Sequence, residues 1–164
     1  LFYAATMRIS SSDRRFLCRA GSPCMANLDH LSAETRKALA ADQGILDTFG
    51  VTVESIGDGR CELICRVPEN LINAGGFAHG SIAFAVMDTA CAYAIRSAGV
   101  SGVTIHGDTH FVRGAAAGDK LLAQVEIVNI GRRVATLRGE TYICADNGDR
   151  KLAAHGAFVF QLRR

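Results

Sequence analysis

One carboxylate interrupts the most apolar stretch of this chain. Asp88 lies within residues 79–98, which are mostly apolar and open with His79 and Gly80. Burying a carboxylate without partners costs on the order of several kcal/mol and raises its pKa. Glycine at a helix start admits a ligand close to the backbone, where the first N–H groups are unpaired and lie at the positive end of the helix dipole. The available chemistry is therefore a buried carboxylate beside backbone donors that can hold a developing oxyanion.

The spacing of a third polar residue extends this pattern. Asn73 stands six positions before His79, and Asp88 follows His79 by nine. With the stretches AFAVMDTACAYA and HFVRGAAAGDKL, this spacing resembles the hotdog-fold acyl-CoA thioesterases, most closely their PaaI type, which is associated with phenylacetate breakdown. The resemblance covers roughly residues 46–162. It implies an α+β hotdog fold, an antiparallel β-sheet wrapped around one long central α-helix, with residues 28–164 as a single domain.

The resemblance also implies an activity. The chain is expected to hydrolyse an aryl- or medium-chain acyl-CoA, such as phenylacetyl-CoA, to the free acid and CoA. Coenzyme A enters only as part of the substrate, and no cofactor is expected. By resemblance, the Gly80 N–H is the oxyanion donor, and the Asn73 amide serves the thioester carbonyl or the turn. Asp88 is the nucleophile or the general base, Thr104 orients the attacking water, and His79 orders the turn.

Two residues depart from the family pattern. Ser81 replaces the glycine that usually follows His-Gly, and Gly114 replaces the proline that usually follows the arginine at the strand end. We expect the first change to alter the turn before the helix and the second to alter the loop beside the substrate. Coenzyme A carries phosphates, which suit basic side chains. The residues predicted to contact the substrate or its CoA part are Ser81, Thr89, Arg113, Arg132 and Arg133.

Gly80 and Asp88 cannot serve one carbonyl within a single chain. Eight residues of helix separate them by about 12 Å, whereas a donor and an attacking group must each stand about 3 Å from the atoms they serve. Two antiparallel helices related by a two-fold axis would place Gly80 of one chain opposite Asp88 of the other. We therefore expect a homodimer with two shared sites. The family resemblance implies that such dimers pair into a homotetramer.

The same residues also have purely structural interpretations. Asp88 can be satisfied by Thr89, by Ser81 or by a neighbouring backbone group. Asn73 by itself is a common turn residue. The adjacent arginines of the turn at 132–133 are most often a solvated pair.

Metal ligands and disulfides are not indicated. His106 and His110 share a strand face, with Asp108 between them, but a third ligand is not evident, so no metal site is expected. The six cysteines are irregularly spaced, and Cys61 and Cys65 share one face of a predicted strand. This usage favours free, buried thiols in a reducing compartment and a cytoplasmic location.

The patterning predicts one buried helix among antiparallel strands. Short turns between successive strands indicate that each pairs with the next. A sheet edge and part of the central helix are left uncovered, which also favours a dimer. The predicted elements are a helix over 31–48, a hairpin over 51–67, a helix over 79–98, and strands over 102–113, 119–131, 133–145 and 151–162.

Composition narrows the partners. The chain has 164 residues and a formal net charge of +2, which gives no reason to expect nucleic acid as a partner. No apolar run reaches the roughly 18 residues of a membrane span, so no membrane partner is expected. Residues 1–27 are interpreted as a leader that is disordered or a non-native extension, and Met25 is a candidate for the natural start. Residues 1–24 are alternatively an organelle-targeting segment, because they are rich in arginine and serine.

Two other functions compete with hydrolysis. A non-catalytic acyl-CoA-binding or sensing protein of the same fold would bind ligand without turnover and would carry an added DNA-binding domain, which the sequence lacks. An enoyl-CoA hydratase expects a histidine a few residues after the aspartate. The next histidine after Asp88 is His106, which argues against hydration.

Overall fold

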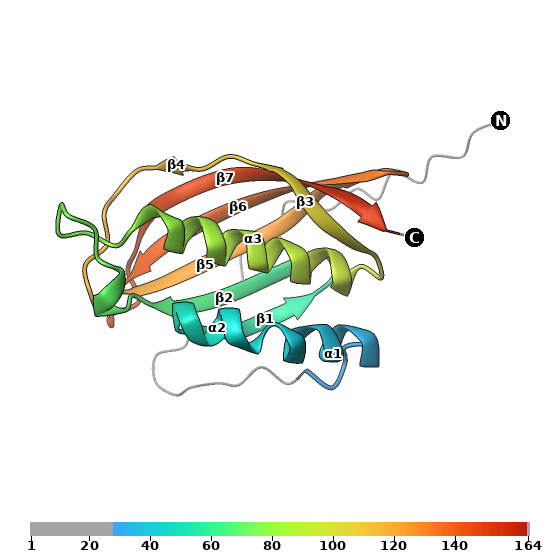
Figure 1. Cartoon of the computed structure of the whole chain (residues 1–164), viewed down its shortest axis with the longest axis horizontal. Coiled ribbons are helices and arrows are strands. Elements are labelled where there is room, and N and C mark those ends of the chain that lie inside the picture. The colour runs from blue at the N-terminus through green and yellow to red at the C-terminus, as the bar shows by residue number, and fades with distance from the viewer. Residues whose placement is uncertain (1–27, 164) are drawn as a thin grey trace.

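The structure is a computed structural model that describes residues 28–163. The predicted leader, residues 1–27, lies outside the described residues. The predicted α+β architecture is confirmed, because a curved antiparallel sheet wraps around one long helix (Figure 1). In chain order the elements are α1 (Ala33–Ala41), α2 (Gln43–Phe49), β1 (Val51–Gly57), β2 (Arg60–Arg66), the 3-10 turn η1 (Glu69–Leu71), α3 (Gly80–Ser97), β3 (Ser101–Gly107), β4 (His110–Phe111), β5 (Lys120–Ile130), β6 (Val134–Cys144) and β7 (Arg150–Arg163).

The central helix α3 confirms the prediction for residues 79–98 to within one residue at each end. His79 is its N-cap, and Gly99, just after its end, has a φ of 78°, a conformation that favours glycine. Half of its side chains are buried, and Met87 is fully enclosed. A methyl group added at Gly139 of β6 would lie 3.1 Å from Met87 Sδ, so this glycine lets the helix approach the sheet closely.

The strand order corrects one expectation. The sheet runs β1-β2-β5-β6-β7-β3, with every pairing antiparallel. The predicted strand 102–113 therefore does not pair with its successor in sequence, but lies across the sheet beside β7. It is also broken after Gly107, and its continuation β4 again pairs with β7. The physical reason is the connection over residues 112–119, which is no tight turn and carries the chain from β7 past β6 to β5, beside β2.

The N-terminal region also differs from the prediction. A single helix was expected over 31–48, whereas the chain forms α1 and α2, which meet at Asp42. The Asp42 N–H donates to the carbonyls of both Ala38 and Leu39, a tightened last turn that ends α1. Ser32 caps α1, because its Oγ accepts from the Thr35 N–H. α2 packs beside β1, and α1 contacts α3.

One sheet edge stays open. β3 ends the strand order, and its apolar side chains Val103 and Ile105 are 38% and 54% exposed. The predicted free thiols are confirmed for the described cysteines, of which Cys61, Cys65 and Cys91 are buried. Within residues 28–163, no helix has both the length and the apolar character needed to cross a membrane.

Candidate functional site

The start of α3 presents a backbone donor. His79 Nδ1 accepts from the Ser81 N–H at 3.1 Å and contacts Ser81 Oγ at 2.8 Å, and the Ile82 N–H donates to the His79 carbonyl. The N–H groups of Ser81 and Ile82 therefore have partners within the described residues. The Gly80 N–H is the donor of this first turn that remains for a ligand. The serine in the family's glycine position therefore takes part in capping the helix. The prediction that His79 orders this turn agrees with its capping contact.

Asn73 organises the loop that leads into α3. Its Oδ1 accepts from the N–H groups of Gly75 at 2.8 Å and Phe77 at 3.3 Å, and its own N–H donates to the Phe77 carbonyl at 2.7 Å. The side-chain amide was predicted to serve either the thioester carbonyl or the turn. Its Oδ1 atom is used within the turn. The Nδ2 group stays available as a second donor.

Asp88 has a partner that the structural interpretation did not name. Thr104 Oγ1 on β3 donates to Asp88 Oδ1 at 2.7 Å, whereas Ser81 bonds to His79 instead. Burial raises the pKa of the Asp88 carboxyl above its usual value, and the Thr104 hydrogen bond opposes this by favouring the ionised form. The carboxylate is thus half-buried and held in one orientation, as a general base or nucleophile requires.

Three contacts connect α3 to the adjoining β3–β4 segment. The Thr104–Asp88 hydrogen bond is the first. Phe84 reaches Gly107, where an added methyl would lie 3.1 Å from its Cζ, and the ring of Phe111 covers Gly80, where an added methyl would lie 2.9 Å from its Cζ. Because positions 80, 84 and 88 are four apart, they share one face of the helix.

The sequence did not predict that two phenylalanines, Phe84 on this face and Phe111 beside it, belong to the candidate site. Phe84 is 36% exposed and Phe111 is 60% exposed, which is unusual for large apolar side chains beside a candidate site. The spacing of 80, 84 and 88 was a signal that could have revealed Phe84. No local pattern could have revealed Phe111, because its contact with Gly80 joins residues 31 positions apart.

The structure does not bring Gly80 and Asp88 together within one chain. They lie on one unbroken helix, about 12 Å apart along its axis. The predicted phosphate-binding arginines are also dispersed. Arg113 is exposed just after β4, and Arg132 and Arg133 occupy the exposed β5–β6 turn, at the end of the sheet opposite the start of α3. Their contact with a substrate, and that of the half-buried Thr89, stays a prediction.

The two histidines of the predicted 102–113 strand do not act together. The strand is interrupted between them, and the His110 ring stacks instead on His155 of β7, with ring centroids 5.1 Å apart. Asp108 Oδ1 accepts from the Ala157 N–H. Over the described part of the chain, no cluster of three or more histidine, cysteine, aspartate or glutamate side chains can hold a metal ion.

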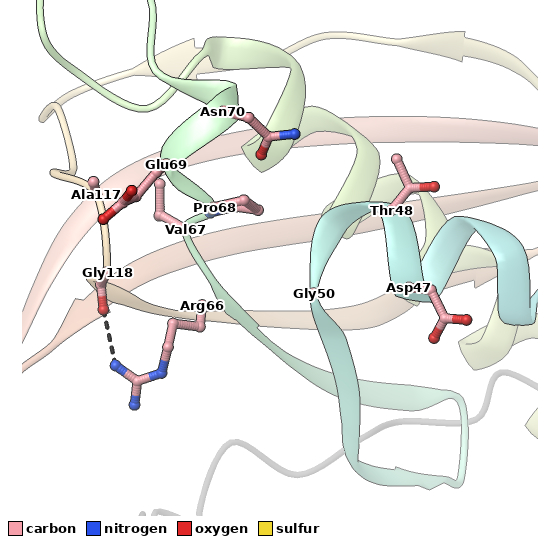
Figure 2. Close-up of a pocket in the computed structure, with 10 residues that line it drawn as sticks. All are labelled: Asp47, Thr48, Gly50, Arg66, Val67, Pro68, Glu69, Asn70, Ala117 and Gly118. Atoms are coloured by element: carbon pink, nitrogen blue, oxygen red, sulfur yellow. Dashed lines mark hydrogen bonds between the residues drawn. The ribbon is translucent and has the colours of Figure 1, made fainter.

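An open pocket of about 680 Å³ lies elsewhere, between the end of α2, the loop after β2 and the turn before β5 (Figure 2). Arg66 Nη1 donates to the Gly118 carbonyl on one side of it, and Asp47 lies on the other side. No predicted site residue lines this pocket. The candidate site is therefore the helix face of Gly80 and Asp88.

Known proteins share this chain's sequence and fold. Residues 75–143 match the thioesterase superfamily. A Halobacterium salinarum protein provisionally named an esterase is 34% identical over 116 residues, which span 66% of this chain and 76% of that protein. Acyl-coenzyme A thioesterase PaaI of Escherichia coli is 26% identical over 106 residues, which span 65% of this chain and 76% of that protein. The structure of a variant of phenylacetic acid degradation protein PaaI from Thermus thermophilus has a TM-score of 0.65 at 28% identity and covers 72% of this chain and 98% of its own.

Proposed function

This chain belongs to the thioesterase superfamily of hotdog-fold thioester hydrolases, and we propose that its substrate is an aryl- or medium-chain acyl-CoA. One observation carries the proposal: Asp88 is half-buried, is oriented by Thr104, and shares a helix face with Gly80, the first residue of α3. Coenzyme A enters as part of the substrate, and no cofactor takes part. The free buried thiols support a reducing, cytoplasmic setting.

The residues divide the chemistry between them. The Gly80 N–H and Asn73 Nδ2 donate to the thioester oxygen and stabilise the negative charge that develops on it. Asp88 either takes a proton from a water molecule that attacks the carbonyl carbon, or attacks that carbon itself and forms an anhydride that water then cleaves. In both routes one water is consumed, the carbon–sulfur bond breaks, and the thiolate of CoA leaves and is protonated.

The site is proposed to be shared between two copies of the chain. The open edge of β3, with Val103 and Ile105 exposed, supports a homodimer, and the family resemblance favours pairing of dimers into tetramers. If Gly80 of one chain faces Asp88 of the other, the two-fold axis passes beside the residue halfway between positions 80 and 88. The midpoint is Phe84, which therefore meets its own copy between the two sites.

The hydrogen bond from Thr104 predicts a shift in pH dependence. Asp88 must be ionised to act, so turnover falls as the pH drops through its pKa. Replacing Thr104 with valine removes the contact that favours the ionised form, and the pKa of Asp88 rises further. The acid limb of the kcat profile is expected to move to higher pH in Thr104→Val and to stay in place in Thr104→Ser. An unmoved acid limb in Thr104→Val would show that Asp88 is not the group whose ionisation limits turnover.

Turnover measurements across acetyl-, hexanoyl-, palmitoyl-, phenylacetyl- and hydroxyphenylacetyl-CoA test the function. We expect release of free CoA thiol, with the highest kcat/KM for the aryl or medium-chain members. Binding of these ligands without thiol release would instead identify a non-catalytic acyl-CoA sensor. A preference for palmitoyl-CoA or acetyl-CoA would contradict the proposed substrate class but leave hydrolysis standing.

A further inference from the structure

Two aromatic rings connect the start of α3 and the loop before it with β4 and the segment that follows β4. The ring of Phe111 lies on Gly80, and the ring of Phe77 lies on Gly114, where an added methyl would stand only 2.6 Å from its Cδ1. The Ala78 N–H donates to the Ala115 carbonyl at 2.7 Å and joins the same two segments. Glycine in the family's proline position therefore makes room for Phe77, because a larger residue at 114 would displace the ring.

Both rings stay largely open to solvent. Phe77 is 53% exposed and Phe111 is 60% exposed, and the adjacent Val112 is 54% exposed. Packing against the two glycines accounts for one part of each ring and leaves the rest uncovered. Large apolar side chains that stay exposed beside a candidate site are typical of a binding surface.

Their position relative to Gly80 indicates what they contact. A carbonyl oxygen bound to the Gly80 N–H stands about 3 Å from the nitrogen. The Phe111 ring lies over the same residue, where an added methyl would stand 2.9 Å from its Cζ. A group attached to the carbonyl carbon can therefore contact this ring. Of the two arms of an acyl-CoA, the pantetheine arm carries amides and ends in phosphates, whereas an acyl group is apolar and matches the rings.

We infer that Phe111 and Phe77 line the acyl subsite and determine acyl selectivity, favouring large apolar acyl groups over acetyl. The inference rests on the proposed function, since it requires the thioester carbonyl at Gly80. Phe111 forms the wall next to the carbonyl, and Phe77 forms the wall beyond it on the loop side.

The variants Phe111→Ala and Phe77→Ala test the inference, with kcat/KM measured for acetyl-, hexanoyl- and phenylacetyl-CoA. Losing an apolar wall is expected to lower kcat/KM for phenylacetyl-CoA by about 10- to 100-fold more than it lowers kcat/KM for acetyl-CoA. Phe111→Leu keeps the packing on Gly80 and is expected to lose aryl selectivity but not hexanoyl turnover. Ile45→Ala, which removes an exposed apolar side chain from α2, is the matched control.

The outcomes separate this inference from the function beneath it. An equal loss across all acyl groups would overturn it, because it would assign the rings to the CoA arm or to the placing of Gly80. An unchanged profile, or dissociation of the oligomer on size-exclusion chromatography, would overturn it as well. Failure of the wild-type protein to hydrolyse any acyl-CoA would instead refute the proposed function.

Discussion

Asp88→Asn is expected to lower kcat by about 10²- to 10⁴-fold, the contribution of a positioned base or nucleophile. Asparagine keeps the size of the side chain and an oxygen that can accept from Thr104 Oγ1, so the helix and the dimer should persist. Steady-state turnover of phenylacetyl-CoA, with chromatography of the oligomer, measures both. Asp146→Asn makes the same chemical change on an exposed turn and should leave turnover unchanged.

The same variant should be more stable than the wild type at neutral pH. Burial raises the pKa of Asp88 in the folded state, so its contribution to stability is fully present below the unfolded-state pKa and is lost as the pH rises through the folded-state pKa. Removing the charge therefore raises Tm at pH 7 to 8, and the gain disappears in acid, where the carboxyl is protonated in both states. Wild-type turnover in Asp88→Asn, or a lowered neutral Tm, would contradict the assignment.

Mixing two inactive variants is expected to restore activity if the site is shared. Gly80→Pro removes the amide proton, and proline is tolerated at the first position of a helix, although its ring will displace Phe111. In a heterodimer with Asp88→Asn, one site combines an intact Gly80 with an intact Asp88 and the other site has neither. After random exchange of subunits half the dimers are mixed, so recovery should approach about one quarter of wild-type activity.

Two controls sharpen this result. Each variant mixed with itself must stay inactive, and recovery must depend on subunit exchange. A cysteine in place of Phe84 should form a disulfide-linked dimer on mild oxidation, because the shared site places this residue beside the two-fold axis. The wild-type protein, whose Cys61, Cys65 and Cys91 are buried, is oxidised in parallel to measure any cross-linking through its own cysteines. No recovery of activity and no cross-link in a dimer that remains intact would show that the two helices do not meet in this register.

The helix α3 shows which features the local sequence can predict and which it cannot. The helix start, the cap at His79 and the stop at Gly99 depend on neighbouring residues, and all three were predictable. The bond between Thr104 and Asp88 was not, although both residues were singled out, because their meeting depends on where β3 lies in the sheet. β3 pairs with β7, which is the last of the strands that follow it in the chain. No turn sequence predicts this pairing.

The sequence by itself therefore determined most of the elements and the candidate residues: an apolar helix with one carboxylate, a glycine at the start of that helix, and strands that cover it. These properties depend on hydrogen-bond partners and apolar spacing within a few residues, which the order of amino acids states directly. Only the tertiary structure decided that Thr104 orients Asp88, that Phe111 and Phe77 rest on Gly80 and Gly114, and that β3 is an open edge. Such contacts join distant segments, and they follow from how the whole sheet closes around α3 to bury the most apolar surface.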